Sequence, residues 1–248
     1  MKKILTLTLC ALFALIFLTG CVTVNFSPFG AQSVSGRGSL ETYTFNVGEI
    51  TEVRVELYCN IVYHSAPSDT VTLQVQPNLM EYISVEESGG ILTVRSSRNI
   101  TSVNNVNVPV LTVSTPSLTR LSHAGAGNFT TVDTITADTF ALYITGAANG
   151  TAKLDVKELS VNITGAGDLT LSGTADTAYI SMAGAGKLEA LLLETRVASI
   201  SMAGAGSVKI SCSEELSISA GGVGTVEYRG SPTVNTTRGG LITVRQVD

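Results

Sequence analysis

The stretch that decides the fold is Ala178–Gly186, AYISMAGAG, which returns as Ala198–Gly206, ASISMAGAG. Its closing Gly-Ala-Gly occurs in six perfect or degenerate copies, whose first glycines are separated by 21, 19, 19, 20 and 18 residues. A repeat of this length predicts a stacked architecture, because each unit is too small to bury its apolar face except against its neighbours. The glycines of the six copies are Gly125, Gly127, Gly146, Gly165, Gly167, Gly184, Gly186, Gly204, Gly206, Gly222 and Gly224.

Aligning the copies on these glycines places apolar residues at alternate positions, which is the period of a β-strand. One apolar column before the glycines holds Leu142, Val161, Ile180, Ile200 and Ile218. A second strand follows the glycines, with one column of Phe129, Leu169, Leu188, Val208 and Val226. The pattern predicts an all-β parallel β-solenoid with coils of about 19–20 residues. We expect the glycines to form the corners of the coils, because glycine tolerates positive φ and has no Cβ to obstruct a neighbouring coil.

The segment before the repeats also alternates between apolar and polar residues. Four segments have the period of a strand, namely Thr42–Phe45, Val53–Leu57, Val71–Val75 and Leu92–Arg95. Only Pro77–Tyr82 is typical of a helical turn. We therefore expect one domain over residues 39–248, made of N-terminal strands over 39–117 and Gly-Ala-Gly repeats over 118–248. At the far end, near residues 233–244, we expect a short antiparallel strand or an irregular cap, because an uncapped end would favour end-to-end association.

The N-terminus is typical of a bacterial lipoprotein signal. Lys2 and Lys3 precede an apolar run, and Leu18-Thr19-Gly20-Cys21 has the form of a lipobox. We expect residues 1–20 to be removed, Cys21 to carry lipid, and residues 21–38 to be a flexible tether. Two alternatives remain open, an uncleaved membrane anchor and an ordinary secretory signal. Stable anchoring requires more than one acyl chain, since a single chain binds membranes only weakly.

Composition and charge argue against several classes of partner. The formal charge is −5, and loss of Lys2 and Lys3 would take it to −7. A nucleic-acid-binding protein would carry a basic cluster, and none follows those two lysines. Outside the signal and the lipobox, only Cys59 and Cys212 remain, far apart and without paired spacing, so we expect small buried residues and no metal site.

Two glycine-rich motifs are superficially similar to ligand sites. Gly165–Leu169 resembles a calcium-binding nonapeptide, but the aspartate column also contains Lys187, which opposes a ladder of cations. The Gly-x-Gly pattern suggests dinucleotide binding only where a helix follows, and here a strand pattern follows. We expect neither a metal nor a cofactor.

Catalytic residues are not evident. His64 follows a strand, and His123 occupies the column of Ile144 and Ile163, where we expect it to cap the apolar column at the first coil. Neither histidine has a nucleophile in a recognisable setting. Paired carboxylates could cleave sugars, but the acidic residues scatter over different columns and predict no convergent pair. These residues are Asp133, Asp155, Asp168, Asp176, Glu189 and Glu194. Tyr143, Tyr179 and Tyr228 also lie in different columns, which weakens a sugar-stacking platform.

The order of elements resembles one bacterial family. The similarity begins with three segments, Ile50–Val55, Asn60–Tyr63 and Val71–Val75. It continues through Leu79–Ile83 and Gly90–Val94. Val113–Leu118, leading to Gly125-Ala126-Gly127, is similar to the Thr-Pro-x-Leu and Gly-x-Gly passage of the "putative auto-transporter adhesin head GIN domain" family. The likeness covers residues 40–248. It implies a right-handed parallel β-helix on secreted or lipid-anchored envelope proteins, without assigned catalytic residues.

Together these observations predict a non-catalytic bacterial cell-envelope protein, anchored outside the cytoplasm through lipidated Cys21. Its β-helical domain would be an adhesin-like surface module that binds a protein or a glycan. The alternatives are a carbohydrate-active enzyme on a β-helix, and an envelope assembly or stress protein that acts through a protein partner.

Overall fold

The computed structural model describes residues 33–101 and 107–248. The expected signal peptide and Cys21 lie outside the described residues. Ser33–Asp248 form one compact unit, and strands make up 78% of the described part against 2% for helix. The expectation of an all-β chain is therefore confirmed, and the expected helical turn is α2 (Pro77–Met80).

The N-terminal strands form two sheets. β1 (Ser33–Ser35) and β8 (Asn99–Thr101) pair in parallel as a small sheet of their own. The larger sheet has the order β2-β5-β9-β4-β10-β3-β7-β6 and bends back on itself into a nearly closed, barrel-like arrangement. Its strands are β2 (Glu41–Phe45), β3 (Glu52–Glu56), β4 (Asn60–His64), β5 (Thr70–Val75), β6 (Ile83–Ser88), β7 (Ile91–Ser96), β9 (Val110–Ser114) and β10 (Arg120–Thr131).

The bend of this sheet lies in β10. Residues Arg120–His123 of β10 pair in parallel with β3, whereas Phe129–Thr131 pair in parallel with β4. β10 thus joins two walls of the sheet, one that contains β3 and one that contains β4. Gly125-Ala126-Gly127 occupies the corner between these walls. The two walls enclose the apolar side chains of alternate positions, as the period of 2 predicts.

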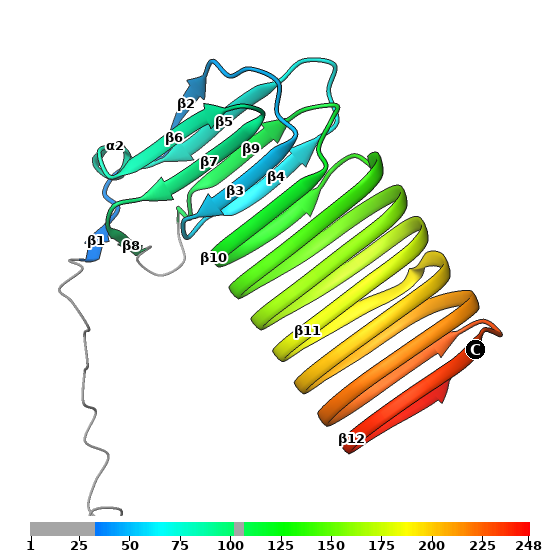
Figure 1. Ribbon diagram of the computed structural model, residues 1–248. Coiled ribbons are helices and arrows are strands. Elements are labelled where there is room, and N and C mark those ends of the chain that lie inside the picture. Colours follow the sequence, from blue (N-terminus) through cyan, green and yellow to red (C-terminus); the bar gives the residue numbers. More distant parts are fainter. Residues whose placement is uncertain (1–32, 102–106) are drawn as a thin grey trace, which may run out of the picture. The chain divides into compact units, whose positions relative to one another are not determined.

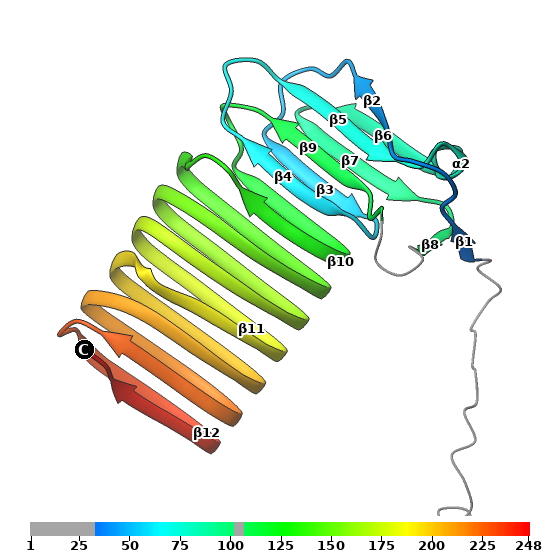
Figure 2. The ribbon, with the colours of Figure 1, turned by 180° about the vertical axis from the view of Figure 1, so that it is seen from behind.

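The repeats continue from β10 in register. β10 pairs in parallel with β11 (Ile135–Arg229) from Arg120↔Ala141 to Thr130↔Thr151, which aligns Gly125 with Gly146. β11 is one continuous extended run that turns repeatedly into stacked rungs, where a rung is one turn of the chain from one Gly-Ala-Gly to the next (Figure 1). β12 (Thr233–Gln246) is the last rung and pairs in parallel with the end of β11. Figure 2 shows the same order of rungs from behind.

One apolar core runs through the N-terminal walls and the rungs. The columns expected from sequence are buried along its length, including Leu142, Val161, Ile180, Ile200 and Ile218. Burial in one continuous file means that each apolar residue is covered by the rung on either side, which a single coil could not provide.

Two expectations are wrong. His123 does not end the apolar column, because Val55 of β3 pairs with it on one side and Ile144 of β11 on the other. The N-terminal strands therefore extend the same core beyond the first Gly-Ala-Gly. At the opposite end, residues 233–246 form neither an antiparallel strand nor an irregular cap, since β12 runs parallel to the strand before it.

Candidate functional site

The two glycines of each repeat serve different purposes. The first adopts a φ that L side chains rarely reach, for example +127° at Gly165 and +136° at Gly184. The second, such as Gly186, has no such φ, but a Cβ there would overlap the carbonyl oxygen of Gly167 in the preceding rung. In the first copy the positive φ falls on Gly127 rather than Gly125. Close backbone stacking therefore disfavours a side chain at both positions, although Ala148 takes the second position in one copy.

Side chains after the glycines satisfy backbone groups of the next rung. The Asn128 amide donates to Asn60 Oδ1 at 3.0 Å, and the Asp168 amide donates to Asn149 Oδ1 at 3.0 Å. In the second of these bonds Asp168, the residue of the calcium comparison, takes part through its backbone N–H. In the described part of the chain, no group of three or more His, Cys, Asp or Glu residues is placed to hold a metal ion.

Charged side chains form two files across the rungs, which sequence reasoning missed. In the first file, Lys209 Nζ lies 3.1 Å from Glu189 Oε1 and 3.6 Å from Glu227 Oε2, and Arg245 pairs with Glu227 in turn. The signs alternate from rung to rung. The sequence contains this pattern as charges of alternating sign at the spacing of the repeat. It emerges when the outward-facing positions of the repeats are aligned in the same way as the apolar positions.

Hydrogen bonds within this first file hold the carboxylates in their charged form. Hydrogen bonding from Arg245, opposed by burial, lowers the pKa of Glu227. Burial of Glu189 acts to raise its pKa, but hydrogen bonds from Lys187 and Lys209 outweigh it and the pKa is lowered.

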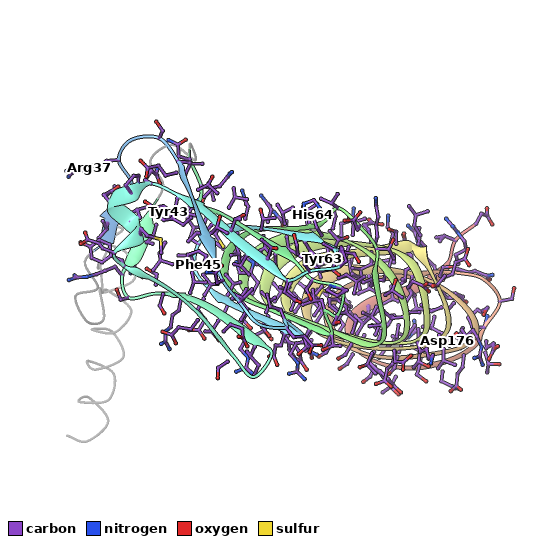
Figure 3. All side chains as sticks on the ribbon, turned by 90° about the horizontal axis from the view of Figure 1, so that it is seen from above. Arg37, Tyr43, Phe45, Tyr63, His64 and Asp176 are labelled. Atoms are coloured by element: carbon purple, nitrogen blue, oxygen red, sulfur yellow. The ribbon has the colours of Figure 1, made fainter. Side chains whose placement is uncertain are left out.

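The second file follows the next side of the coil. Lys157 Nζ lies 2.7 Å from Asp138 Oδ1, and Arg196 holds Glu214 through two hydrogen bonds of 2.9 and 3.0 Å. Between them stands Asp176, whose negative charge adds to the raised pKa of both Lys157 and Arg196. In Figure 3 the side chain of Asp176 extends outward from the rungs. Alternating charges at adjacent strands favour the observed register over a slipped one.

A groove opens beside this second file because the rungs differ in length. From Gly184 to Ala198, the start of the next apolar strand, there are 14 positions, but from Gly204 to Leu216 there are only 12. Leu191 and Leu192 of the longer rung line the groove and are called its ledge here. The hollow beside this ledge has a volume of about 520 Å³, within the range of roughly 300–1,000 Å³ typical of small-molecule sites.

The groove has an apolar ledge and a charged rim. Leu192 is 69% exposed, which is unusual for a large apolar side chain in this unit. Arg229 reaches across the intervening rung and donates from Nη1 to the Leu191 carbonyl oxygen at 3.3 Å. Asp176, Glu194 and Arg196 stand around the same hollow. The rim thus offers both hydrogen-bond donors and acceptors next to an apolar surface.

The floor of the groove is firmly held. Buried Thr195 donates from its hydroxyl to the Ser211 carbonyl oxygen at 2.7 Å, and Ser213 donates to the Thr195 carbonyl oxygen at 3.3 Å. The Cys212 thiol lies 3.3 Å from the Arg196 carbonyl oxygen of the preceding rung. These bonds tie adjacent rungs together, so the hollow is a preformed feature of the stack.

Two of the acidic residues considered from the sequence, Asp176 and Glu194, line this groove together with Arg196 and Arg229. The other four acidic residues do not line this groove, although Asp155 lines a neighbouring hollow together with Asp176. Asp133 lies 3.5 Å from the ring of His64, and Asp155 accepts a hydrogen bond of 2.8 Å from Thr174.

Neither histidine lines the groove, whereas Cys212 belongs to its lining. Figure 3 shows His64 at the rim of its wall, next to inward-facing Tyr63. His123 is buried, its Nε2 lies 3.3 Å from the Leu57 carbonyl oxygen, and burial lowers its pKa. Cys59 and Cys212 are buried free thiols, as expected of small core residues.

The tyrosines do not form a platform. Tyr179 is half exposed, the Tyr143 ring is covered by Arg120 at 5.2 Å, and Tyr228 packs against the core. A sugar-stacking surface made from these three rings is therefore absent from the described part of the chain.

Comparison with known proteins gives one family and several related folds. Residues 49–232 match the family described as "Putative auto-transporter adhesin, head GIN domain". No curated protein is significantly similar to this chain. Within the described residues, no helix is long and apolar enough to cross a membrane.

Three crystal structures show the same fold. A "putative adhesin" from Bacteroides fragilis superposes with a TM-score of 0.78 at 22% identity, over 86% of this chain and 100% of its own. A "putative lipid binding protein" from Parabacteroides distasonis has a TM-score of 0.65 at 17% identity, and a "putative adhesin" from Parabacteroides merdae has 0.60 at 20%. Each covers 88% of this chain and all of its own length. At these identities the likeness concerns the fold alone.

Proposed function

Because the chain belongs to the family described as "putative auto-transporter adhesin, head GIN domain", we propose that it is an adhesin-like module of the bacterial cell envelope that binds a glycan in the groove beside Leu191 and Leu192. The observation that carries this proposal is the groove itself, a preformed hollow of about 520 Å³ with an exposed apolar ledge.

The chemistry of the rim favours a glycan over a large protein surface. Sugars present hydroxyl groups that donate and accept hydrogen bonds, and apolar C–H faces that pack on side chains. Glu194 and Asp176 would accept from hydroxyl groups, Arg229 would donate to them, and Leu192 would contact a sugar face. A protein partner instead requires roughly 800 Å² on each side.

The repeats would form a right-handed parallel β-helix, with residues 39–248 as one domain. In-register parallel pairing from β10 to β11 and from β11 to β12 supports the coil. The glycine contacts between successive rungs support a role for the Gly-Ala-Gly tripeptides as its corners. Such a stack projects its grooves away from the backbone core, which suits a surface module.

The anchor in this proposal is a lipid on Cys21, with residues 1–20 removed and the module held outside the cytoplasm. The lipobox Leu18-Thr19-Gly20-Cys21 supports it. Metabolic labelling with a clickable fatty acid should mark the wild-type chain and not the Cys21→Ser variant. Equal labelling of both would place the lipid elsewhere.

A glycan array tests the groove. We expect the unit Ser33–Asp248 to bind a defined set of glycans, and Leu192→Ser and Arg229→Ala to bind them at least tenfold more weakly, about 1.4 kcal/mol. Tyr179→Ser, which lies outside the groove lining, is the matched control and should bind as the wild type does. If the groove variants bind as well as the control, the site is wrong, and silence across all glycans would favour a protein ligand.

A carbohydrate-active enzyme is a second candidate, favoured by the presence of Asp176 and Glu194 in one hollow. Glycosidases use two carboxylates separated by about 5–10 Å. Incubation with the bound glycans should release no reducing ends if the module is non-catalytic. Turnover that disappears in Asp176→Asn and Glu194→Gln would instead establish the enzyme.

A further inference from the structure

The last rung presents a complete strand edge. β12 pairs with β11 along its whole length, from Glu215↔Thr233 to Tyr228↔Gln246. Within residues 33–101 and 107–248, no strand pairs with its other edge. Figure 1 shows β12 as the terminal rung of the stack. An unpaired edge is a template for another extended segment.

The backbone groups of this edge point away from the stack at alternate residues. The Val247 amide donates to the Tyr228 carbonyl oxygen at 2.8 Å, so it faces β11. Since successive residues of a strand direct their N–H groups to opposite sides, the amides of Val244 and Gln246 face the open edge. An added strand would find its hydrogen-bonding partners there.

The charges on this edge define what could pair with it. In the first charged file the signs run Glu189, Lys209, Glu227, Arg245, and every member except the last has an opposite charge on the following rung. The side chain of Arg245 is 63% exposed and meets Glu227 on one side only. The next position in the file would be filled by a carboxylate.

The same edge opposes pairing with a second copy of itself. Arg238 is in register with Ala220, at the inward position where earlier rungs hold Met182 and Met202. It is exposed and has no ion-pair partner among the described residues. β12 thus carries two arginines and no acidic residue. Two such edges would bring like charges together, and an inward-pointing charge is a known protection against edge-to-edge stacking.

We propose that the open edge of β12 is the docking site of an extended acidic segment of a partner protein. The segment adds as one more strand, places a carboxylate beside Arg245, and covers Ile242 and Val244 with an apolar side chain. This inference does not rest on the groove, whose lining contains no residue of β12.

Two synthetic peptides test the charge rule. The first has the sequence of residues 224–229, GTVEYR, because this strand already pairs with β12 from the inner side through Glu227. The second differs by Glu227→Lys. Both carry a fluorescent label, and their anisotropy is measured against the full-length chain in nonionic detergent. We expect the glutamate peptide to bind roughly tenfold or more tightly than the lysine peptide.

A reversed charge in the protein should reverse the preference. The Arg245→Glu variant should bind the lysine peptide and reject the glutamate peptide, with its circular dichroism spectrum unchanged. The proposal is overturned if both peptides bind equally, if the variant keeps the wild-type preference, or if neither peptide binds.

Hydrogen exchange provides the second readout. Binding of the glutamate peptide should slow exchange at the amides of Val244 and Gln246 and leave the groove residues unchanged. Protection in the groove would overturn the proposed location. Concentration-dependent self-association of the wild-type chain in sedimentation velocity, strengthened by Arg238→Ala or Arg245→Ala because the like charges are removed, would show that the edge binds a second copy instead.

Discussion

Gly184 lies against Gly165 of the preceding rung so closely that a Cβ on Gly184 would overlap the Gly165 carbonyl oxygen. Its φ of +136° also lies in a region that L side chains rarely adopt. The same relationship recurs along the stack at Gly165, Gly204 and Gly222, which makes the first glycine position of each corner intolerant of any side chain.

Substitution at this corner should therefore be severe. Gly184→Ala combines a strained backbone with a backbone clash, and we expect it to lower the free energy of unfolding by about 3 kcal/mol or more. The matched control is Gly221→Ala, because nothing lies within 4 Å of a Cβ at Gly221 and its φ is not positive. The control should change stability by about 0.5 kcal/mol at most. Denaturant unfolding followed by circular dichroism measures both, and similar losses would disprove the corner argument.

His123 should make stability depend on pH. It is buried between Val55 and Ile144, its Nδ1 has no hydrogen-bond partner, and its folded pKa is lowered from 6.5, chiefly by burial. As the pH falls, the His123 imidazole therefore takes up a proton more readily in the unfolded chain than in the folded chain. The free energy of unfolding is not reduced by this histidine above about pH 6.5. Below that pH it falls as the pH decreases, by up to about 1.4 kcal/mol per pH unit.

The variant that checks this pH dependence is His123→Met, since Met182 and Met202 occupy later positions of the same column. Denaturation between pH 7.5 and about 5 should show a smaller loss in His123→Met than in the wild type. His64→Gln serves as the control, because His64 is half exposed beside Asp133 and should leave the His123 effect in place. An unchanged profile in His123→Met would rule out this histidine as the cause.

The charged file should contribute to stability in a salt-dependent manner. Lys209→Glu would place three carboxylates in neighbouring rungs, between Glu189 and Glu227. We expect its Tm to lie below that of Lys209→Gln at low salt, and the difference to shrink at about 1 M salt because charges there are screened over about 3 Å. A difference that does not change with salt would indicate a packing effect instead of charge repulsion.

Both thiols of the described unit should be unreactive in the folded state. Burial raises the pKa of Cys59 to about 12, so almost no thiolate is present at neutral pH. Cys212 is buried as well, although it lines the groove floor. Alkylation with iodoacetamide should modify neither cysteine in Ser33–Asp248 until denaturant is added, whereas modification of Cys212 alone under native conditions would show that the groove floor opens.

Much of the fold follows from local pattern. Alternation of apolar residues requires strands, and the spacing of Gly-Ala-Gly requires that like positions stack, so the core columns and the all-β class are predictable. The extension of the apolar column past His123 could not be predicted, because the segment of β3 lacks the Gly-Ala-Gly tripeptide that marks the later rungs. The parallel course of β12 was missed for a related reason, since Thr236 and Arg238 interrupt the apolar pattern at inward positions.

The sequence by itself determined the strands, the period of the rungs and the residues that face inward, because these depend on short-range alternation and on a repeat that any reader can align. Only the tertiary structure decided the groove, the alternating charges and the open edge. Asp176, Glu194 and Arg229 stand far apart along the chain, and they meet because rungs of unequal length are stacked at close spacing. A difference of two residues between neighbouring rungs creates a groove only when the two rungs are stacked on each other.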